Sequence, residues 1–140
     1  MRFVIALILF SNPAWAECAN NERTFLSCQF ENGKAVEVCM SGEVASYRFG
    51  RAGQTPELAL SLRFGEGAEA VPWPGVGSSI WEAVRLTNND VIYEVYGGFD
   101  RFKALEEGVV AHFGGIYIED ANGNELAHLE CIPETVDFVF

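Results

Sequence analysis

The 140-residue chain has little positive charge. Nine Lys and Arg stand against twenty Asp and Glu, which gives a formal net charge of −11. Nucleic acid and anionic lipid headgroups repel a chain this acidic, so we expect neither as a partner. The same charge attracts a cationic protein at long range, although surplus negative charge also keeps an exported protein soluble without any partner.

The residue patterns of common catalytic and metal sites are also missing. The chain has only two histidines, His112 and His128, and no G-x-S-x-G segment that would supply an activated serine. Its four cysteines are ten, eleven and ninety-two residues apart, whereas zinc sites use closely spaced C-x₂₋₄-C pairs. We therefore expect no metal, no cofactor and no enzymatic activity. A hydrolase that uses two carboxylates brought together by folding needs no local motif, and this alternative stays open.

No hydrophobic run has the roughly 20 residues needed to cross a bilayer. The apolar run 3–10 follows Arg2 and precedes the small-x-small site Ala14-Trp15-Ala16. This order predicts a cleaved secretory signal peptide over 1–16 and a single mature domain over 17–140. Loss of Arg2 leaves eight basic against twenty acidic residues, a net charge of −12. We expect the mature protein to be soluble, not membrane-embedded, and periplasmic or secreted; its oligomeric state is not predicted.

Turn residues recur about every ten residues and separate runs rich in Val, Ile, Phe, Tyr and Leu. This spacing predicts an all-β fold of about eight short strands in meander order. The expected strands are 24–30, 35–40, 44–49, 57–64, 79–86, 91–96, 108–119 and 125–131. Only 102–107 is expected to form a turn of helix. We favour a single small antiparallel β-barrel, because closure removes exposed strand edges, with a β-sandwich as the alternative.

An even number of cysteines in an exported chain predicts two disulfides, for which three pairings exist. A two-residue Asn-Gly hairpin turn places Cys28 opposite Glu37, so that Cys28 and Cys39 do not face each other. Cys39 then lies near the start of the first strand, within reach of Cys18, and Cys28 is left for Cys131. We favour Cys18–Cys39 with Cys28–Cys131, and the alternative is Cys18–Cys28 with Cys39–Cys131.

Aromatic residues and arginines gather at the expected loops and strand ends. The segment Pro72-Trp73-Pro74-Gly75 presents a tryptophan on a rigid loop, and such loops are typical of protein- or sugar-binding surfaces. The candidate partner-binding residues are Trp73, Trp81, Tyr96, Phe99, Asp100, Arg101 and Tyr47. The alternative is structural: Trp73 folds back into the barrel, and Asp100 and Arg101 form a local salt bridge.

In the first expected hairpin, residues 27–38, Cys28 precedes a Gly33-Lys34 turn. In these residues the chain resembles the bacterial membrane-bound and periplasmic inhibitors of c-type lysozyme. The resemblance implies a small exported antiparallel barrel, with Cys131 as the match for the partner of Cys28. Members of that family insert a Ser-Gly-x-x-Tyr loop into the lysozyme cleft. Here Ser41-Gly42 is followed by Tyr47 with more residues between them than that signature has.

The sequence therefore favours an exported, non-catalytic binding protein that blocks a cationic protein, such as a lysozyme or another cell-wall hydrolase. One alternative is a periplasmic barrel that holds a small apolar ligand. The other is the carboxylate-dependent hydrolase.

Overall fold

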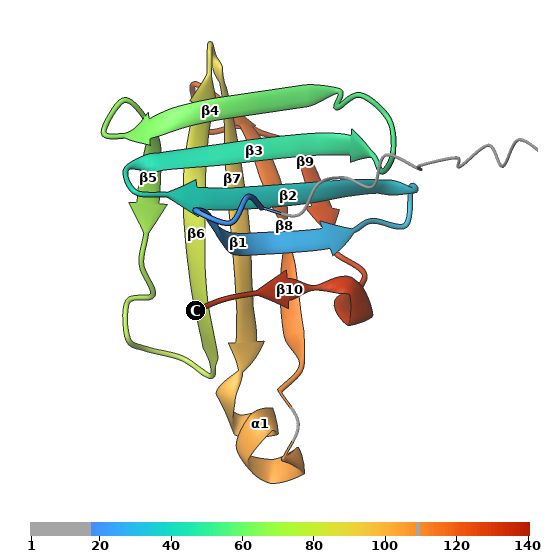
Figure 1. The fold of residues 1–140 in the computed structure, drawn as a ribbon. Helices are drawn as coiled ribbons and strands as arrows, with labels where there is room; N and C mark the ends of the chain where they lie inside the picture. Colours follow the sequence, from blue (N-terminus) through green and yellow to red (C-terminus); the bar gives the residue numbers. More distant parts are fainter. Residues whose placement is uncertain (1–17, 109) are drawn as a thin grey trace, which may run out of the picture.

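The computed structural model describes residues 18–108 and 110–140, so the expected signal peptide, 1–16, lies outside the described residues. The described part is all-β, as predicted, with one short helix and one 3₁₀ turn (Figure 1). Its elements are β1 (Arg23–Gln29), β2 (Lys34–Ser41), β3 (Val44–Arg51), β4 (Leu58–Phe64), β5 (Gly67–Val71), β6 (Ser79–Asn88), β7 (Val91–Asp100), α1 (Arg101–Glu107), β8 (His112–Asp120), β9 (Glu125–Glu130), η1 (Pro133–Thr135) and β10 (Asp137–Phe138).

These strands form one curled, barrel-like sheet in the order β10-β1-β2-β3-β4-β5-β6-β7-β8-β9. Figure 1 shows it as two layers, with β10 and β1–β4 running crosswise over β5–β9. The strands pair antiparallel except where β4 meets β5, through Arg63 with Gly67 and Phe64 with Ala68. The sheet therefore folds over at this corner, and the two layers pack as crosswise sheets do.

Pairing does not run all the way round the barrel, because the order starts at β10 and ends at β9. Beyond β9, the N–H of Ile132 donates to the carbonyl oxygen of Gln29 in β1 at 2.8 Å. The disulfide Cys28–Cys131 crosslinks the same two segments. β1 and the segment after β9 are thus joined by a disulfide and by hydrogen bonds at Gln29, which also donates its N–H to Thr135 Oγ1 at 3.0 Å. No strand pairing between β9 and β10 closes the barrel among the described residues.

Every second side chain along the strands faces inward, and these side chains form the core between the two layers. In β2 the residues Val36, Val38 and Met40 face inward, as Val84 and Leu86 do in β6. The other core side chains in the described part are Phe25, Leu26, Cys28, Phe30, Ala45, Tyr47, Ala68, Val95, Ile116, Cys131 and Phe138. β2 is buried on both faces: Cys39 and Glu37, on the side away from the core, are 3% and 7% exposed.

The first hairpin corrects one detail of the sequence prediction. Cys28 lies opposite Val36 rather than Glu37, because Phe30 donates its N–H to the carbonyl oxygen of Lys34 and the loop has three residues. Gly33 takes the left-handed conformation, with φ of 82°, that ends such a loop. The favoured disulfide pairing is nevertheless the one present, because either register keeps the two cysteines of the hairpin apart.

Both disulfides tie the layer that holds β1 and β2. Cys18–Cys39 spans 21 residues and Cys28–Cys131 spans 103. Two short strands were not expected from the sequence: β5 contains glycine and two alanines, and β10 has only two residues. Among the described residues, no helix is both long and apolar enough to cross a membrane.

Candidate functional site

The structure separates the seven candidate residues into different environments. Trp73, Asp100 and Arg101 lie together where α1 leaves the sheet, while Trp81 and Tyr96 lie on the outer face of the layer that contains β6 and β7. Phe99, the last residue but one of β7, lies next to His112, with ring centroids 6.1 Å apart. Tyr47 is placed in the core. The candidates therefore do not form one surface. Two groups remain: Trp73 with Asp100 and Arg101, and Trp81 with Tyr96.

α1 protrudes beyond the sheet (Figure 1). Asp100 caps its first turn by accepting the N–H groups of Phe102 and Lys103 at 2.9 and 3.0 Å. Gly108 ends it in the left-handed conformation and donates to the carbonyl oxygen of Ala104. Asp100 thus acts as a helix cap, and no ion pair between Asp100 and Arg101 occurs in the described part of the chain.

Arg101 joins α1 to the preceding loop. Its guanidinium lies 5.7 Å from the ring centre of Trp73 and 5.1 Å from that of Phe102, both cation–π distances. The Trp73 indole N–H donates to the carbonyl oxygen of Val76 at 3.0 Å. The Nε atom of Arg101 is buried and has no hydrogen-bond partner among the described residues. The loop and the helix are therefore held to each other by ring contacts around one arginine.

This end of the molecule carries exposed apolar side chains that the sequence analysis did not single out. Leu105 is 81% exposed, Val76 70%, Val110 52% and Phe102 51%. No side chain of α1 is buried. We call the surface formed by Trp73, Val76, Arg101, Phe102, Leu105 and Val110 the tip. The spacing of Phe102 and Leu105, three residues apart and on one helix face, was the available sequence signal.

An aromatic row continues from the tip along the outer face of β6–β9. Trp81 and Phe113 lie on either side of Gly98, which pairs with both. The residues of this row are half-buried and alternate with core residues; they are Trp81, Phe113, Tyr96, Tyr117 and His128. Tyr117 and His128 stack with ring centroids 3.9 Å apart. We call this row the aromatic stripe, and three of its members became visible only once the strands were in register.

Tyr96 is the most constrained residue of the aromatic stripe. Its hydroxyl lies 2.7 Å from His128 Nε2, and its ring lies over Gly115, where a side chain would collide with it. Burial raises the pKa of Tyr96, and the neighbouring Tyr117 and Glu130 add to the effect. Tyr96 is therefore a neutral hydrogen-bonding group in this surface at any physiological pH, not a base.

Tyr47 corrects the sequence prediction. It is 1% exposed and packs against Tyr93 with ring centroids 5.6 Å apart. Burial is also the main reason that its pKa is raised. A position one residue away in β3 would have faced outward, because alternate residues of a strand face opposite sides. Tyr47 therefore belongs to the core and presents almost no surface to a partner.

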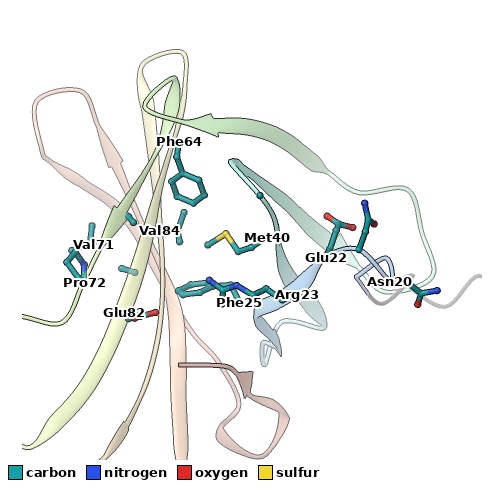
Figure 2. Close-up of a pocket in the computed structure, with 14 residues that line it drawn as sticks. Asn20, Glu22, Arg23, Phe25, Met40, Phe64, Val71, Pro72, Glu82 and Val84 are labelled. Carbon is teal, nitrogen blue, oxygen red and sulfur yellow. The ribbon is translucent and has the colours of Figure 1, made fainter.

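A pocket of about 540 Å³ opens between the two layers (Figure 2). Its apolar wall is formed by Phe25, Met40, Phe64 and Val84. Charged and polar side chains also line it, among them Arg23, Glu22 and Glu82. The lining therefore suits a small molecule that is apolar at one end and polar at the other.

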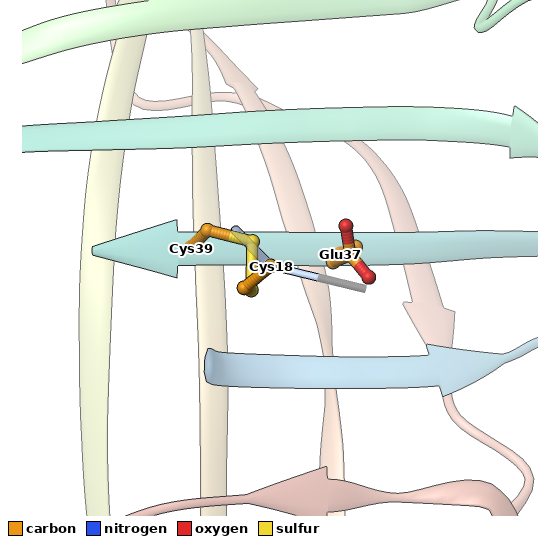
Figure 3. Close-up of side chains that lie close together, drawn as sticks. All are labelled: Cys18, Glu37 and Cys39. Atoms are coloured by element: carbon orange, nitrogen blue, oxygen red, sulfur yellow. A yellow bond between two sulfur atoms is a disulfide. The ribbon is translucent and has the colours of Figure 1, made fainter. Parts of the chain in front are cut away.

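One cluster has the residue types of a metal site. Cys18, Glu37 and Cys39 bring their ligand atoms within 4.8 Å of one another (Figure 3). The two sulfurs are bonded to each other, so neither is a thiolate, the form that binds metals. Glu37 instead forms an ion pair with Arg48 of β3. The cluster is a structural crosslink.

No family model matches this chain, and no curated protein or solved structure is significantly similar to it.

Proposed function

We propose that this protein is an exported, non-catalytic binding protein that captures a cationic protein with its tip, and that a c-type lysozyme is such a partner. The observation that carries the proposal is the exposure of Leu105, Phe102, Val76 and Val110 on one protruding end. Exposed apolar groups rimmed by polar ones mark interaction sites in soluble proteins. The two disulfides support export, because such bonds persist in oxidising compartments.

Charge supports the choice of a cationic partner. The mature chain would carry −12, with Arg2 removed from the nine basic residues. Such a field speeds the encounter with a positively charged protein, while buried apolar anchors hold the complex together. The catalytic acid of a lysozyme lies against an apolar wall. A protruding helix with the exposed apolar side chains Phe102 and Leu105 is suited to cover that kind of surface and so exclude substrate.

The test is a titration of c-type lysozyme activity with the mature protein, disulfides intact, at low and at physiological salt. We expect inhibition that weakens as salt screens the attraction. The double variant Phe102→Ser, Leu105→Ser should weaken inhibition by about tenfold or more, since apolar anchors near an interface centre each contribute about 1–2 kcal/mol.

Leu126→Ser is the matched control, because Leu126 is an exposed leucine, 57% accessible, on β9 and outside the tip. It should inhibit as the unchanged protein does. Equal inhibition by the tip variant and the control would place the contact elsewhere. No inhibition by the unchanged protein at either salt concentration would end the lysozyme proposal and restrict the family resemblance to the first hairpin.

The pocket between the layers supports a second candidate function, the binding of a small amphipathic molecule. Its apolar wall and its charged rim, with Arg23 and Glu82, match the two ends of such a ligand. This function does not use the tip.

An anionic naphthalene-sulfonate dye is a suitable probe for this second candidate. We expect saturable one-to-one binding that Ala70→Trp weakens about fivefold or more by filling the pocket, which Ala70 lines. Ala121→Trp, in an exposed turn, is the control. Dye binding that is the same in all three proteins would exclude the pocket as its site.

A further inference from the structure

β4 is the outermost strand of its layer (Figure 1). On one side it pairs with β3 from Leu58 with Phe49 to Arg63 with Val44. In the described part of the chain, its other strand neighbour is β5, which it meets only at Arg63 and Phe64. The other side of residues 58–62 is therefore a free sheet edge.

The backbone groups on this edge can be assigned from the pairing. Phe64 donates its N–H to the carbonyl oxygen of Glu43, on the β3 side, at 2.8 Å. Residues of an antiparallel strand alternate between bonding to one neighbour and facing the other way. The N–H and C=O groups of Ala59 and Ser61 therefore point to the free edge and are available to another strand.

This edge lacks the usual protection against pairing. Natural edge strands carry charges, proline or a bulge. Residues 58–62 read Leu-Ala-Leu-Ser-Leu and contain none of these. The inward-facing Leu58, Leu60 and Leu62 are only half-buried, although they pack against the core. A strand added here would therefore gain both hydrogen bonds and apolar contact.

We propose that the occupant is β4 of a second copy of this chain, in an antiparallel pair around a two-fold axis at Leu60. In this register Leu58 lies opposite Leu62 of the second copy. The flanking Glu57 lies opposite Arg63 of the second copy, so the two-fold axis creates this ion pair twice. Residues Ala59 and Ser61 face each other as the hydrogen-bonded pairs.

Charge selects this register over its neighbours. A shift of two residues, which keeps the same hydrogen-bonding side, places Glu57 opposite Ser61 and loses both ion pairs. Within one chain, Glu57 contacts Lys34 at 2.9 Å and Arg63 contacts Glu43 at 2.6 Å. The Glu57 and Arg63 side chains are 50% and 59% exposed, and exposed pairs of this kind are weak. Both charges therefore remain available to the second copy.

Sedimentation of the mature protein over a range of concentrations tests the proposal. We expect a monomer–dimer equilibrium. Arg63→Glu and Glu57→Arg should each raise the dimer dissociation constant about tenfold, because each places two like-charged pairs across the axis. The charge swap Glu57→Arg, Arg63→Glu should restore the original value. The swap Lys103→Glu, Glu125→Arg, at exposed positions outside β4, is the matched control and should leave dimerisation unchanged.

Ser61→Pro separates pairing from folding. The backbone N–H of Ser61 faces the free edge, where proline is tolerated. The variant should therefore remain folded, with a thermal midpoint close to that of the unchanged protein. It should sediment as a monomer. A monomeric unchanged protein, a charge swap that fails to restore the dimer, or an undiminished dimer in folded Ser61→Pro would each overturn the proposal.

Discussion

The two-layered sheet with its two disulfides, which we call the framework, differs from the tip in how far its apolar side chains are buried. In the framework, Cys28 and Leu26 are 2% and 0% exposed, and two disulfides tie distant segments together. In the tip, no side chain of α1 is buried and Leu105 is 81% exposed. Four of the seven exposed large apolar side chains in the described part of the chain lie in the tip. We therefore expect substitutions in the tip to leave the framework that carries it folded.

At the end of β6–β9 that lies away from α1, short turns are enough to connect the strands. There β6 and β7 join through a tight turn in which Asn89 takes a left-handed conformation, with φ of 54°. β8 and β9 join through a short turn closed by Asp120, whose N–H donates to the carbonyl oxygen of Asn124 at 2.9 Å. The long connection through α1, with its exposed apolar side chains, is therefore a specific feature of one end, which supports a role in binding.

Removal of the long-range disulfide is the most severe test of this division. The double variant Cys28→Ala, Cys131→Ala releases a 103-residue loop. Loop-closure entropy then predicts a loss of roughly 3–5 kcal/mol in the free energy of unfolding. Urea unfolding measures it. Cys18→Ala, Cys39→Ala, which opens only 21 residues, should cost less, about 3 kcal/mol. A larger loss from the shorter loop would contradict the comparison.

Gly115 tests how far the framework extends beneath the aromatic stripe. A Cβ atom at this position would collide with the backbone carbonyl oxygen of Leu129 and lie 2.5 Å from the Tyr96 hydroxyl. Gly115→Ala should therefore lower the free energy of unfolding by about 1–3 kcal/mol, as overpacking does. Gly123→Ala differs, because no atom lies near its Cβ position but its φ of 82° is unfavourable for alanine.

Calorimetry of both glycine variants separates steric collision from backbone strain. Strain at a left-handed position costs about 1–2 kcal/mol, so Gly123→Ala should also be destabilised. Only Gly115→Ala should displace Tyr96 from His128, which the chemical shifts of the His128 ring would report. An unchanged ring environment in Gly115→Ala would show that the backbone, and not the tyrosine, gives way.

Much of the framework was predictable because its signals are local. The Asn-Gly turns, the alternation of residues 57–64 and the even cysteine count predicted an all-β fold with two disulfides. Of the two pairings considered, the favoured one is present. The register of the first hairpin was wrong by one residue, because Gly33 ends a three-residue loop, and Asn-Gly also suits a two-residue one. The folding-over at β4 and β5 depends on long-range packing that no short segment encodes.

The candidate site was less predictable. Trp73 and Arg101 were identified from their loop and strand-end positions, and the structure brings them together. Tyr47 was assigned to the surface, but its side of β3 depends on strand register, which sequence alone left open. The exposure of Leu105 and Phe102 was missed, because apolar residues are expected inside and only the position of α1 shows that nothing covers them.

The Asp120 turn should respond to pH in a way that the tip does not. Hydrogen bonds from the Asn124 side chain, and then from backbone N–H groups of Asn124 and Asn122, hold the pKa of Asp120 below its usual 3.8. A carboxylate whose pKa is lowered by folding stabilises the folded protein at pH values above its ordinary pKa. This stabilisation is lost as the pH falls through the lowered, folded-state pKa. The thermal midpoint of Asp120→Ala should therefore lie below that of the unchanged protein at neutral pH.

This difference in midpoint should stay constant at pH values well above 3.8 and shrink as the pH falls below 3.8. Calorimetry at several pH values measures it. Glu125→Ala, which removes a carboxylate at an exposed position in the same hairpin, is the matched control. A gap that widens at low pH would mean that the carboxylate destabilises the turn.

The smallest effect on stability is expected at the tip. Leu105→Ser removes a side chain that is 81% exposed, so the free energy of unfolding should change by no more than about 0.5 kcal/mol. Leu86→Ser, at a core leucine that is 0% exposed, should cost several-fold more, because it leaves a cavity and buries a hydroxyl. Urea unfolding compares the two. A large loss at Leu105 would mean that the tip folds back on the framework in solution, and the separation of stability from recognition would then fail.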